Sequence, residues 1–345
     1  MRSGPSDDEL QHNRRSGYWR QYHLAHTLEM DALVGGIVSL VKESGPPDED
    51  ERTTARRGRR RGRRPVHSRE KLVVVCLLTV ILGCTFREMQ RLVPKLPLPW
   101  QEEPCPDHST IHRAYQRMPQ RYLDSLLERS AGLCIRETGW KKGVLAADSS
   151  GVETDRYEEV SRPSRSQRGF VTIRRILPLK YHIVAMLDHL VILRAVVTGC
   201  RVHDSPTLRR MLAGFPRMPG CVFNADRGYD AEKNCERLYA LGMRPNIRQK
   251  DEMSHWGGAK AHKKLFNRIR AAKSFDRTLY RYRGLIEGIF GAEETGGHRL
   301  RCRFRTDGSR ERWGPALAIG WNLKVLNRIR CGKRLGMEVM PITQN

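Results

Sequence analysis

The sequence has 345 residues, and 63 Lys or Arg outnumber 38 Asp or Glu to give a formal net charge of +25. This length accommodates two or three domains, and 39% hydrophobic residues exclude a chain too polar to form a core. So large a positive excess favours a polyanionic partner, with nucleic acid as the first candidate, and a merely solvated cationic surface is the alternative.

The nine cysteines are scattered without a Cys-x-x-Cys pair, which indicates free thiols in a reducing compartment. Cys105, His108 and His112 could supply three ligands of a zinc site, but a fourth ligand is missing. The N-terminus is polar and lacks a secretory signal, and the longest apolar run, 72–82, is too short to span a membrane. We therefore expect a cytoplasmic protein and read that run as a buried helix.

The first two segments of the chain carry little apolar pattern. Residues 1–43 are a weak leading segment, with one helix expected near its end. Residues 44–69 are typical of a linker that is first acidic and then rich in arginine, so disorder in isolation is expected. The two halves of this linker can pair with each other. Alternatively, the basic half is an arm that lies along phosphates, with contacts predicted at Arg59, Arg60 and Arg61.

Residues 70–125 are predicted to form a helical domain. Its three expected helices cover 71–82, 85–93 and 107–118; Thr85 is the expected cap of the second, and Asp107 or Ser109 of the third. A trihelical unit whose last helix is polar and basic resembles a helix-turn-helix reader of nucleic acid. A plain helical bundle is the alternative that the pattern leaves open.

From residue 140 to about 335 the hydrophobic period changes to that of an α/β domain. The expected order is three strands, helix, strand, helix, strand and helix, and a further core-packing helix is expected over 310–330. A hairpin followed by βαβ crossovers predicts one mixed sheet flanked by helices. The strands are expected at 144–148, 181–187, 191–197, 221–226 and 243–247, and the helices at 205–215, 230–241 and 278–292.

Three carboxylates stand out by their positions in this order. Asp148 ends the first strand in "AADSSG", Asp226 ends the fourth in "NADRG", and Glu287 lies on the helix over 278–292. Functional groups collect at strand ends, and three acids that meet there repel one another unless cations neutralise them. Mg²⁺ takes oxygen ligands, and two such ions about 4 Å apart can activate and stabilise the oxygens of a phosphodiester reaction. Each acid also has a structural alternative, a turn for Asp148 or Asp226 and a surface helix position for Glu287.

Basic residues surround these acids in the sequence. A short basic insertion is predicted at about 248–277, where charge without sequence pattern suits contact with phosphates. Arg299 and Arg301 belong to an alternating run that would place arginines on one face of a strand, which lines a DNA groove or else is a solvated edge. Lys180 is a predicted phosphate contact, and Asp204 is expected to cap the helix that follows it.

Taken together, these stretches resemble the DDE transposases of bacterial and archaeal insertion sequences, especially the insertion sequence five family and its relatives. Tyr280-x2-Arg283-x3-Glu287 looks like the Tyr-x2-Arg-x3-Glu signature around the third acid, and "AADSSG" and "NADRGYD" resemble the motifs of the first two. "HDSP" sits where the family often has such a stretch, and "PDHSTIHR" resembles the helix-turn-helix segment that precedes its catalytic domain. The resemblance runs from about residue 70 to 330.

The resemblance implies an RNase H-like fold in which Asp148, Asp226 and Glu287 hold Mg²⁺ or Mn²⁺. It also implies nicking at element ends, followed by attack of the freed 3′-OH on target DNA. Tyr280 and Arg283 become contacts to the DNA end. The implied partners are the double-stranded DNA of the element ends and of the target, and a second copy of the chain that holds the paired ends.

One position departs from this family pattern. The fuller signature has a lysine after six further residues, where this sequence has Glu294. This departure supports the second of two rival functions that stay open. One is a metal-dependent nuclease or resolvase on the same fold, which cuts and never joins, and the other is a silent DNA-binding derivative.

Overall fold

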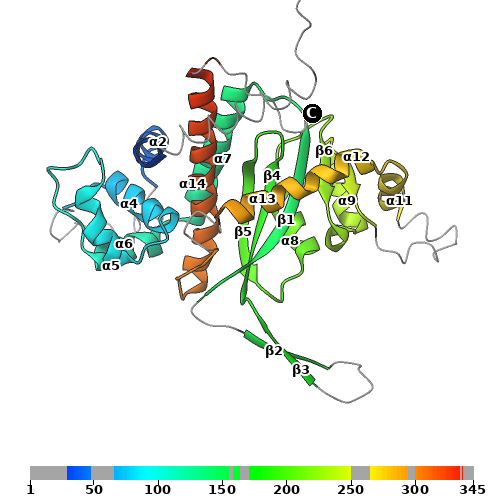
Figure 1. Cartoon of the computed structure of the whole chain (residues 1–345), viewed down its shortest axis with the longest axis horizontal. Helices are drawn as coiled ribbons and strands as arrows, with labels where there is room; N and C mark the ends of the chain where they lie inside the picture. The colour runs from blue at the N-terminus through cyan, green and yellow to red at the C-terminus, as the bar shows by residue number, and fades with distance from the viewer. Residues whose placement is uncertain are drawn as a thin grey trace, which may run out of the picture. The chain divides into compact units, whose positions relative to one another are not determined.

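The computed structural model describes residues 29–47, 66–154, 158–163, 171–249, 265–293, 300–334 and 336. These residues divide into two compact units, shown together in Figure 1. The first unit lies within 1–139 and 319–340, and the second within 140–318 and 341–345.

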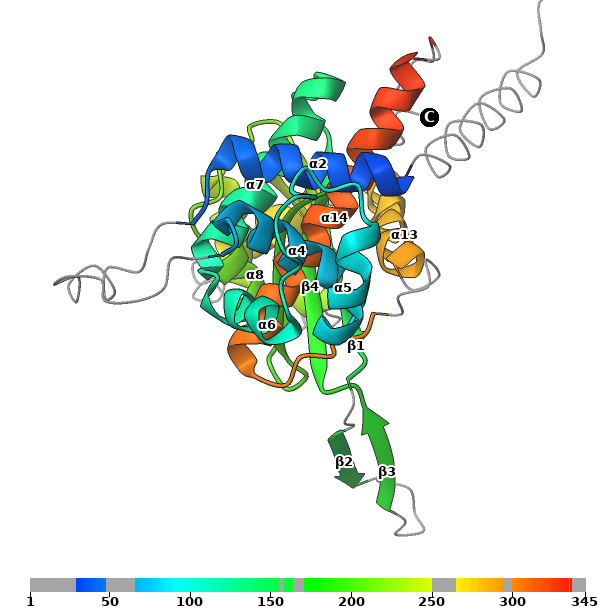
Figure 2. The same cartoon turned by 90° about the vertical axis from the view of Figure 1, so that its left-hand side faces the viewer.

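The first unit is all helical. Its core is formed by apolar side chains of helices that pack on one another, such as α2 on α4 and α7, and Figure 2 shows these helices. The helices are α2 (Glu29–Ser44), α4 (Arg69–Ile81), α5 (Phe86–Leu92), the 3₁₀ turn η1 (Val93–Lys95), α6 (His108–Arg117), α7 (Gln120–Thr138) and the second half of α14 (Asp307–Arg334).

The three predicted helices of this unit are confirmed, with their caps. Thr85 and Glu88 form a capping box at α5, with hydrogen bonds of 3.2 and 2.6 Å. Asp107 rather than Ser109 caps α6, because its Oδ1 accepts hydrogen bonds from the backbone amides of Ser109 and Thr110. The sequence did not predict α7, which begins after Pro119 and ends at Gly139 in a left-handed conformation (φ 64°).

No single helix among the described residues is long and apolar enough to cross a membrane. In the part of the chain that the structure describes, one pair of helical segments, α4 and α5–η1, satisfies length and composition together, and the two are bent by 115°. Ten of the thirteen residues of α4 are buried inside the unit, as predicted for the apolar run.

The second unit is built on a five-stranded mixed sheet. The order is β5-β4-β1-β6-β7, with β1, β4 and β5 antiparallel and β1, β6 and β7 parallel. This is the strand order of the RNase H-like fold, so the predicted fold class is confirmed. The strands are β1 (Val144–Val152), β4 (Leu179–Met186), β5 (Val191–Gly199), β6 (Val222–Ala225) and β7 (Arg244–Ile247).

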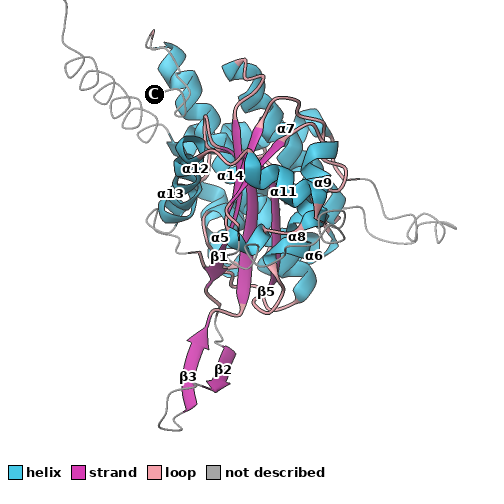
Figure 3. Cartoon of the chain, turned by 90° about the vertical axis from the view of Figure 1, so that its right-hand side faces the viewer, coloured by secondary structure: helices cyan, strands magenta, loops and turns pink. Residues whose placement is uncertain are grey.

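Helices cover both faces of this sheet. In Figure 3 the strands run between α12 and α13 on one side and α8 and α9 on the other. The expected long helix over 278–292 is interrupted by a 3₁₀ turn, so that three short elements replace it. The elements are α8 (Asp204–Met211), α9 (Glu232–Ala240), α11 (Phe266–Lys273), α12 (Arg277–Tyr280), η4 (Arg281–Arg283) and α13 (Gly284–Glu293).

Two further features differ from the sequence predictions. A two-stranded hairpin of β2 (Glu158–Pro163) and β3 (Val171–Ile176) separates β1 from β4 and was not predicted. The expected strand around Arg301 does not form; Arg301 makes one isolated bridge to Glu153. β1 ends at Val152, and the bridge is made by the Leu300 carbonyl and the Cys302 amide, which bond the backbone of Glu153 just beyond the strand. The helix expected over 310–330 is confirmed, and Trp313 on it is buried.

Candidate active site

Asp148 and Asp226 lie side by side because of the strand register. Ala146 of β1 pairs with Asn224 of β6 in parallel, and each aspartate follows its strand residue by two positions. The ends of parallel strands meet at one edge of a sheet, which is where α/β proteins collect functional groups. Asp226 Oδ1 accepts a hydrogen bond of 2.8 Å from the Gly228 amide, which fixes the carboxylate over the turn.

Asp148 points to the face of the sheet that α13 covers. It lies opposite Ile183 on β4, and Tyr181 on the same face packs edge-on against Phe290 of α13, with ring centres 6.0 Å apart. The Asp148 side chain is 16% exposed. Its Oδ1 accepts a hydrogen bond of 2.9 Å from the Ser149 amide.

Glu287 joins Asp148 through the guanidinium of Arg283. One terminal nitrogen of Arg283 lies 2.8 Å from Asp148 Oδ2, and the other lies 2.7 Å from Glu287 Oε1. Arg283 and Glu287 are four residues apart, so they share one side of the helical segment that runs from η4 into α13. The Glu287 side chain is 61% exposed and is therefore accessible to a ligand.

Electrostatics place all three acids in one site. Burial raises the pKa of Asp148, and the charges of Asp226 and Glu287 raise it further, while the Ser149 amide and Arg283 oppose them. Burial disfavours the Arg283 guanidinium, but Asp148, Glu287 and Asp226 raise its pKa on balance. The three carboxylates are thus close enough to act on one another and on the same cation.

The donors of this site suit a metal ion, but their arrangement does not. The donors are carboxylate oxygens, the ligand type that Mg²⁺ and Mn²⁺ prefer. Within the described ranges, however, no three His, Cys, Asp or Glu side chains are grouped so that they could hold a metal ion. Arg283 takes the cationic position between Asp148 and Glu287, so this arrangement does not fit a metal held by all three acids. The same finding gives no support to zinc at Cys105, His108 and His112.

Tyr280 lies beside Arg283 on the short elements before α13. The largest effect on the pKa of the Tyr280 hydroxyl is burial, which raises it. The charge of Asp226 raises this pKa further, while the hydrogen bond with Arg283 lowers it. Its ring packs against Phe275, with centres 5.1 Å apart. The structure therefore brings the two residues predicted to contact the DNA end to the same place as the acids.

The other predicted DNA contacts lie elsewhere. Arg301 is exposed on its bridge to Glu153. Four more, Arg59, Arg60, Arg61 and Arg299, lie outside the described residues together with Glu294.

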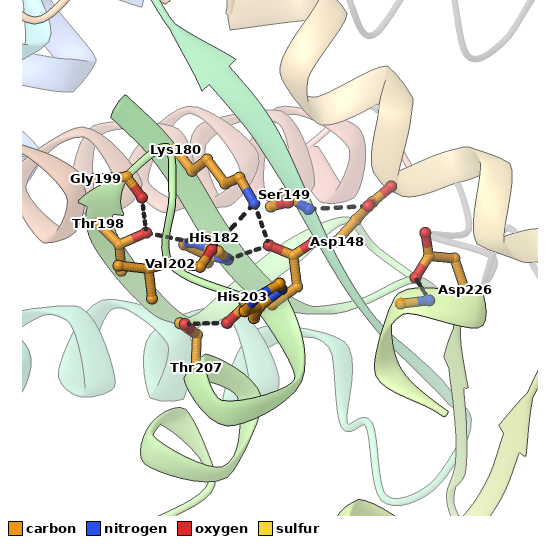
Figure 4. A network of polar contacts seen from close by, with 12 residues as sticks. Asp148, Ser149, Lys180, His182, Thr198, Gly199, Val202, His203, Thr207 and Asp226 are labelled. Carbon is orange, nitrogen blue, oxygen red and sulfur yellow. Dashed lines mark hydrogen bonds and ion pairs between the residues drawn. The ribbon is translucent and has the colours of Figure 1, made fainter. Parts of the chain in front are cut away.

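Lys180 lies on the other face of the sheet, in a second polar network. Figure 4 shows this network beside Asp148 and Asp226. Lys180 Nζ donates to the Val202 carbonyl at 3.1 Å and to Asp204 Oδ1 at 3.0 Å. The prediction that Asp204 caps α8 is wrong, because His203 occupies the cap position without a side-chain cap bond and the Asp204 carboxylate binds Lys180 instead.

Two residues near the acids were missed at the sequence level. Tyr229 is buried, and its hydroxyl interacts with Ser149 and lies in the fields of Asp204, Asp148 and Asp226. Ser149 directly follows Asp148, and Tyr229 lies three residues after Asp226. Their adjacency to the two aspartates in "AADSSG" and "NADRGYD" was the available signal.

A model of the transposase DDE domain family matches residues 139–323, which is more than half of the chain and includes the three acids. The chain belongs to the transposase DDE domain family. It is therefore a DNA transposase, an enzyme that cuts and joins DNA by metal-dependent chemistry. None of the curated proteins matches the chain.

Solved structures similar to this transposase include two complexes of Mos1 transposase. The Mos1 transposase paired-end complex with left transposon end is 11% identical over 86% of this chain and 100% of that chain, with a TM-score of 0.22. The Mos1 mariner paired end complex with Mn is 13% identical over 83% and 96% of the two chains, with a TM-score of 0.21. The family assignment rests on the match over residues 139–323.

Proposed function

We propose that Asp148, Asp226 and Glu287 are the three acids of this transposase. The observation that carries the proposal is the Arg283 guanidinium, which bonds both Asp148 and Glu287 while Asp226 stands at the adjacent strand end. Two of the acids stand at adjacent strand ends and the third on the helix that packs against β1. Acids gathered in this way cost stability through repulsion, and a catalytic role accounts for that cost.

The proposed reaction nicks the element ends and joins each freed 3′-OH to target DNA. We propose Mg²⁺ as the divalent cation, with Mn²⁺ as a substitute, since the acids offer only oxygen donors. Binding of this cation requires Arg283 to leave its present position, because the Arg283 guanidinium bridges Asp148 and Glu287. The Tyr280, Arg283 and Glu287 spacing supports membership of the insertion sequence five group.

We further propose that Arg283 and Tyr280 contact the DNA end. Arginine forms paired hydrogen bonds with phosphate, so a DNA strand offers its guanidinium an alternative to the acids. Lys180 and Arg301 remain predicted phosphate contacts, as do Arg59, Arg60, Arg61 and Arg299, although Lys180 Nζ binds Asp204 in this structure.

In the helical unit, α6 is the proposed reading helix. Its Ile111 and Tyr115 are buried, while His112, Arg113 and Gln116 are exposed on the other side. A polar helix face of this kind suits the major groove. A homodimer is proposed because two DNA ends must be held together for joining.

The test is cleavage and joining of a short donor duplex that carries the element end. Asp226→Asn should abolish both activities and leave DNA affinity within about twofold, because the change removes one charge from a site separate from the bulk of the DNA contacts. Asp307→Asn, on an exposed acid at the start of α14, is the matched control and should remain active. Joining by Asp226→Asn would exclude the assignment, and cleavage without joined products from the unmodified chain would identify a nuclease.

A further inference from the structure

The Asp204 side chain is oriented by β4, although the residue belongs to α8. Its Oδ1 lies 3.0 Å from Lys180 Nζ and 3.7 Å from His182 Nδ1. Lys180 also donates to the Val202 carbonyl, and Figure 4 shows Lys180 and His182 meeting this network from the strand. One carboxylate oxygen is therefore held in place, and the rotation of the side chain is restricted.

The other oxygen of Asp204 faces the turn that carries Asp226. A Cβ atom built on Gly228 would lie 3.8 Å from Asp204 Oδ2 and 3.0 Å from Asp226 Oδ1. Both carboxylates therefore approach the same Cα, from α8 and from the end of β6. Any side chain at Gly228 would crowd the Asp226 carboxylate, so glycine permits this approach.

Tyr229 connects the same acid to β1. Burial raises the pKa of the Tyr229 hydroxyl, and among the charges that raise it Asp204 comes before Asp148 and Asp226. The hydroxyl interacts with Ser149, the residue after Asp148. Ser149 pairs with His182 across the β1–β4 ladder, so it shares the α8 face of the sheet. Asp204 thus lies at the junction of the backbone segments that carry Asp148 and Asp226.

Stability alone does not account for this arrangement. The side chains of Lys180 and Asp204 are about one-quarter exposed, and ion pairs accessible to water contribute little. The Asp204 carboxylate nevertheless lies close to the turn that carries Asp226, where Lys180 holds it. A charged side chain whose orientation is fixed beside reacting groups is expected where the chemistry uses that orientation.

We propose that Asp204 is a positioning residue of the transposase reaction, which acts through the Gly228 turn to orient Asp226. The Lys180 ammonium fixes Asp204, and the negative charge of Asp204 beside Gly228 sets the direction of the Asp226 carboxylate. This inference rests on the proposed role of Asp226. It concerns a residue whose sequence context predicted only a helix cap.

The first experiment compares Asp204→Asn with the unmodified chain on the donor duplex. The substitution keeps the shape and removes the charge, so we expect the cleavage rate at saturating DNA to fall about 10- to 100-fold, as misplaced reacting groups do. The Kd for the duplex should stay within about twofold, since Asp204 is not a DNA contact. Glu137→Gln is the matched control, because it breaks ion pairs of an acid in the other unit and should leave the cleavage rate unchanged.

The second experiment exchanges the charges, with Lys180→Asp and Asp204→Lys in one chain. A purely structural ion pair would be restored by this exchange, and both the melting temperature and the cleavage rate would recover. Cleavage is measured at saturating DNA, so that the loss of Lys180 as a phosphate contact changes the Kd and not the rate. The proposal expects the melting temperature to recover and this cleavage rate to stay low, because the charge beside Gly228 is then positive. Recovery of the rate in the exchanged chain, or a normal rate in Asp204→Asn, would overturn the proposal.

The Asp204→Asn and Asp226→Asn variants together distinguish a failure of the positioning role from a failure of the proposed function. Loss of cleavage in Asp226→Asn together with a normal rate in Asp204→Asn would refute only the positioning role. Retained cleavage in Asp226→Asn would refute the assignment of the acids themselves.

Discussion

Arg283 and Asp148 form an ion pair at 2.8 Å, although 135 residues separate them in the sequence. The same guanidinium bonds Glu287 at 2.7 Å, so the single positive charge of Arg283 is shared by two acids of the proposed site. A divalent cation of the family reaction would be drawn to the same carboxylates. Arginine and metal therefore compete for one position, and a DNA phosphate that attracts Arg283 would favour the metal.

Arg283→Gln should strengthen the binding of Mn²⁺ to the DNA-free protein. Removal of the competing guanidinium should lower the Kd about tenfold, a typical coupling between two linked binding events. Titration of free Mn²⁺ by electron paramagnetic resonance measures this without any reaction. Arg281→Gln is the matched control, since Arg281 is exposed on the same turn and lies over the Tyr282 ring. An unchanged Kd in Arg283→Gln would show that the arginine does not compete.

Asp148→Asn should stabilise the fold while it abolishes activity. Burial raises the pKa of this carboxyl, so the charged form is less favourable in the folded chain than in the unfolded chain at neutral pH. Replacing it with a neutral isostere should increase the free energy of unfolding by about 1 kcal/mol, as substitutions at strained functional sites often do. Thermal unfolding at pH 7.5 checks this, with the exposed Asp307→Asn as control. A lower melting temperature for Asp148→Asn would mean that its ion pair with Arg283 outweighs burial.

Much of the fold was predictable because its signals are local. The runs that form β1, β4 and β5 are apolar and short, and Thr85 and Asp107 are capping residues that act within three positions. Asp148 and Asp226 could be placed at strand ends from the lengths of the preceding apolar runs. These inferences need no knowledge of how distant segments meet.

The parts that were missed depend on tertiary contacts. Asp204 has the sequence context of a helix cap, and only the position of Lys180 on β4 shows that its carboxylate turns away from the helix. Apolar and basic residues alternate around Arg301 as they do in a strand. Its bridge partner, Glu153, however, lies one residue beyond the end of β1. The bridging role of Arg283 likewise requires β1 and α13 to pack together, which its signature spacing does not reveal.

Lys71 should be essential to the stability of the helical unit. Its side chain is almost fully buried, and Nζ donates to the carbonyls of Trp100, Glu103 and Pro104 at 3.1 to 3.2 Å. Lys71→Met keeps the length but leaves these carbonyls without their donor, at a cost of about 2 to 4 kcal/mol. Urea unfolding should show this loss, together with faster proteolysis between α5 and α6. The exposed Lys95→Met should behave like the unmodified chain, and equal stability of the two variants would contradict the role of Lys71.

His182 should make the fold less stable in mild acid. The ring is buried, and burial lowers its pKa to about 4 from the ordinary value of 6.5, although Asp204 opposes the shift. The folded chain therefore binds this proton less readily than the unfolded chain. The stabilising contribution is complete above pH 6.5, falls as the pH decreases toward 4, and changes no further below that.

Between pH 7.5 and 5.0 this single group should cost about 2 kcal/mol of unfolding free energy. His182→Gln keeps a polar partner for Thr198, which the ring meets at 2.8 Å, and removes the titration. Urea unfolding at the two pH values should show a clear loss for the unmodified chain and a smaller loss for the variant. The exposed His112→Gln is the control and should keep the full loss. If His182→Gln lost as much stability as the unmodified chain, another group would take up the proton. The conclusion that the His182 ring is neutral beside Asp204 would then be wrong.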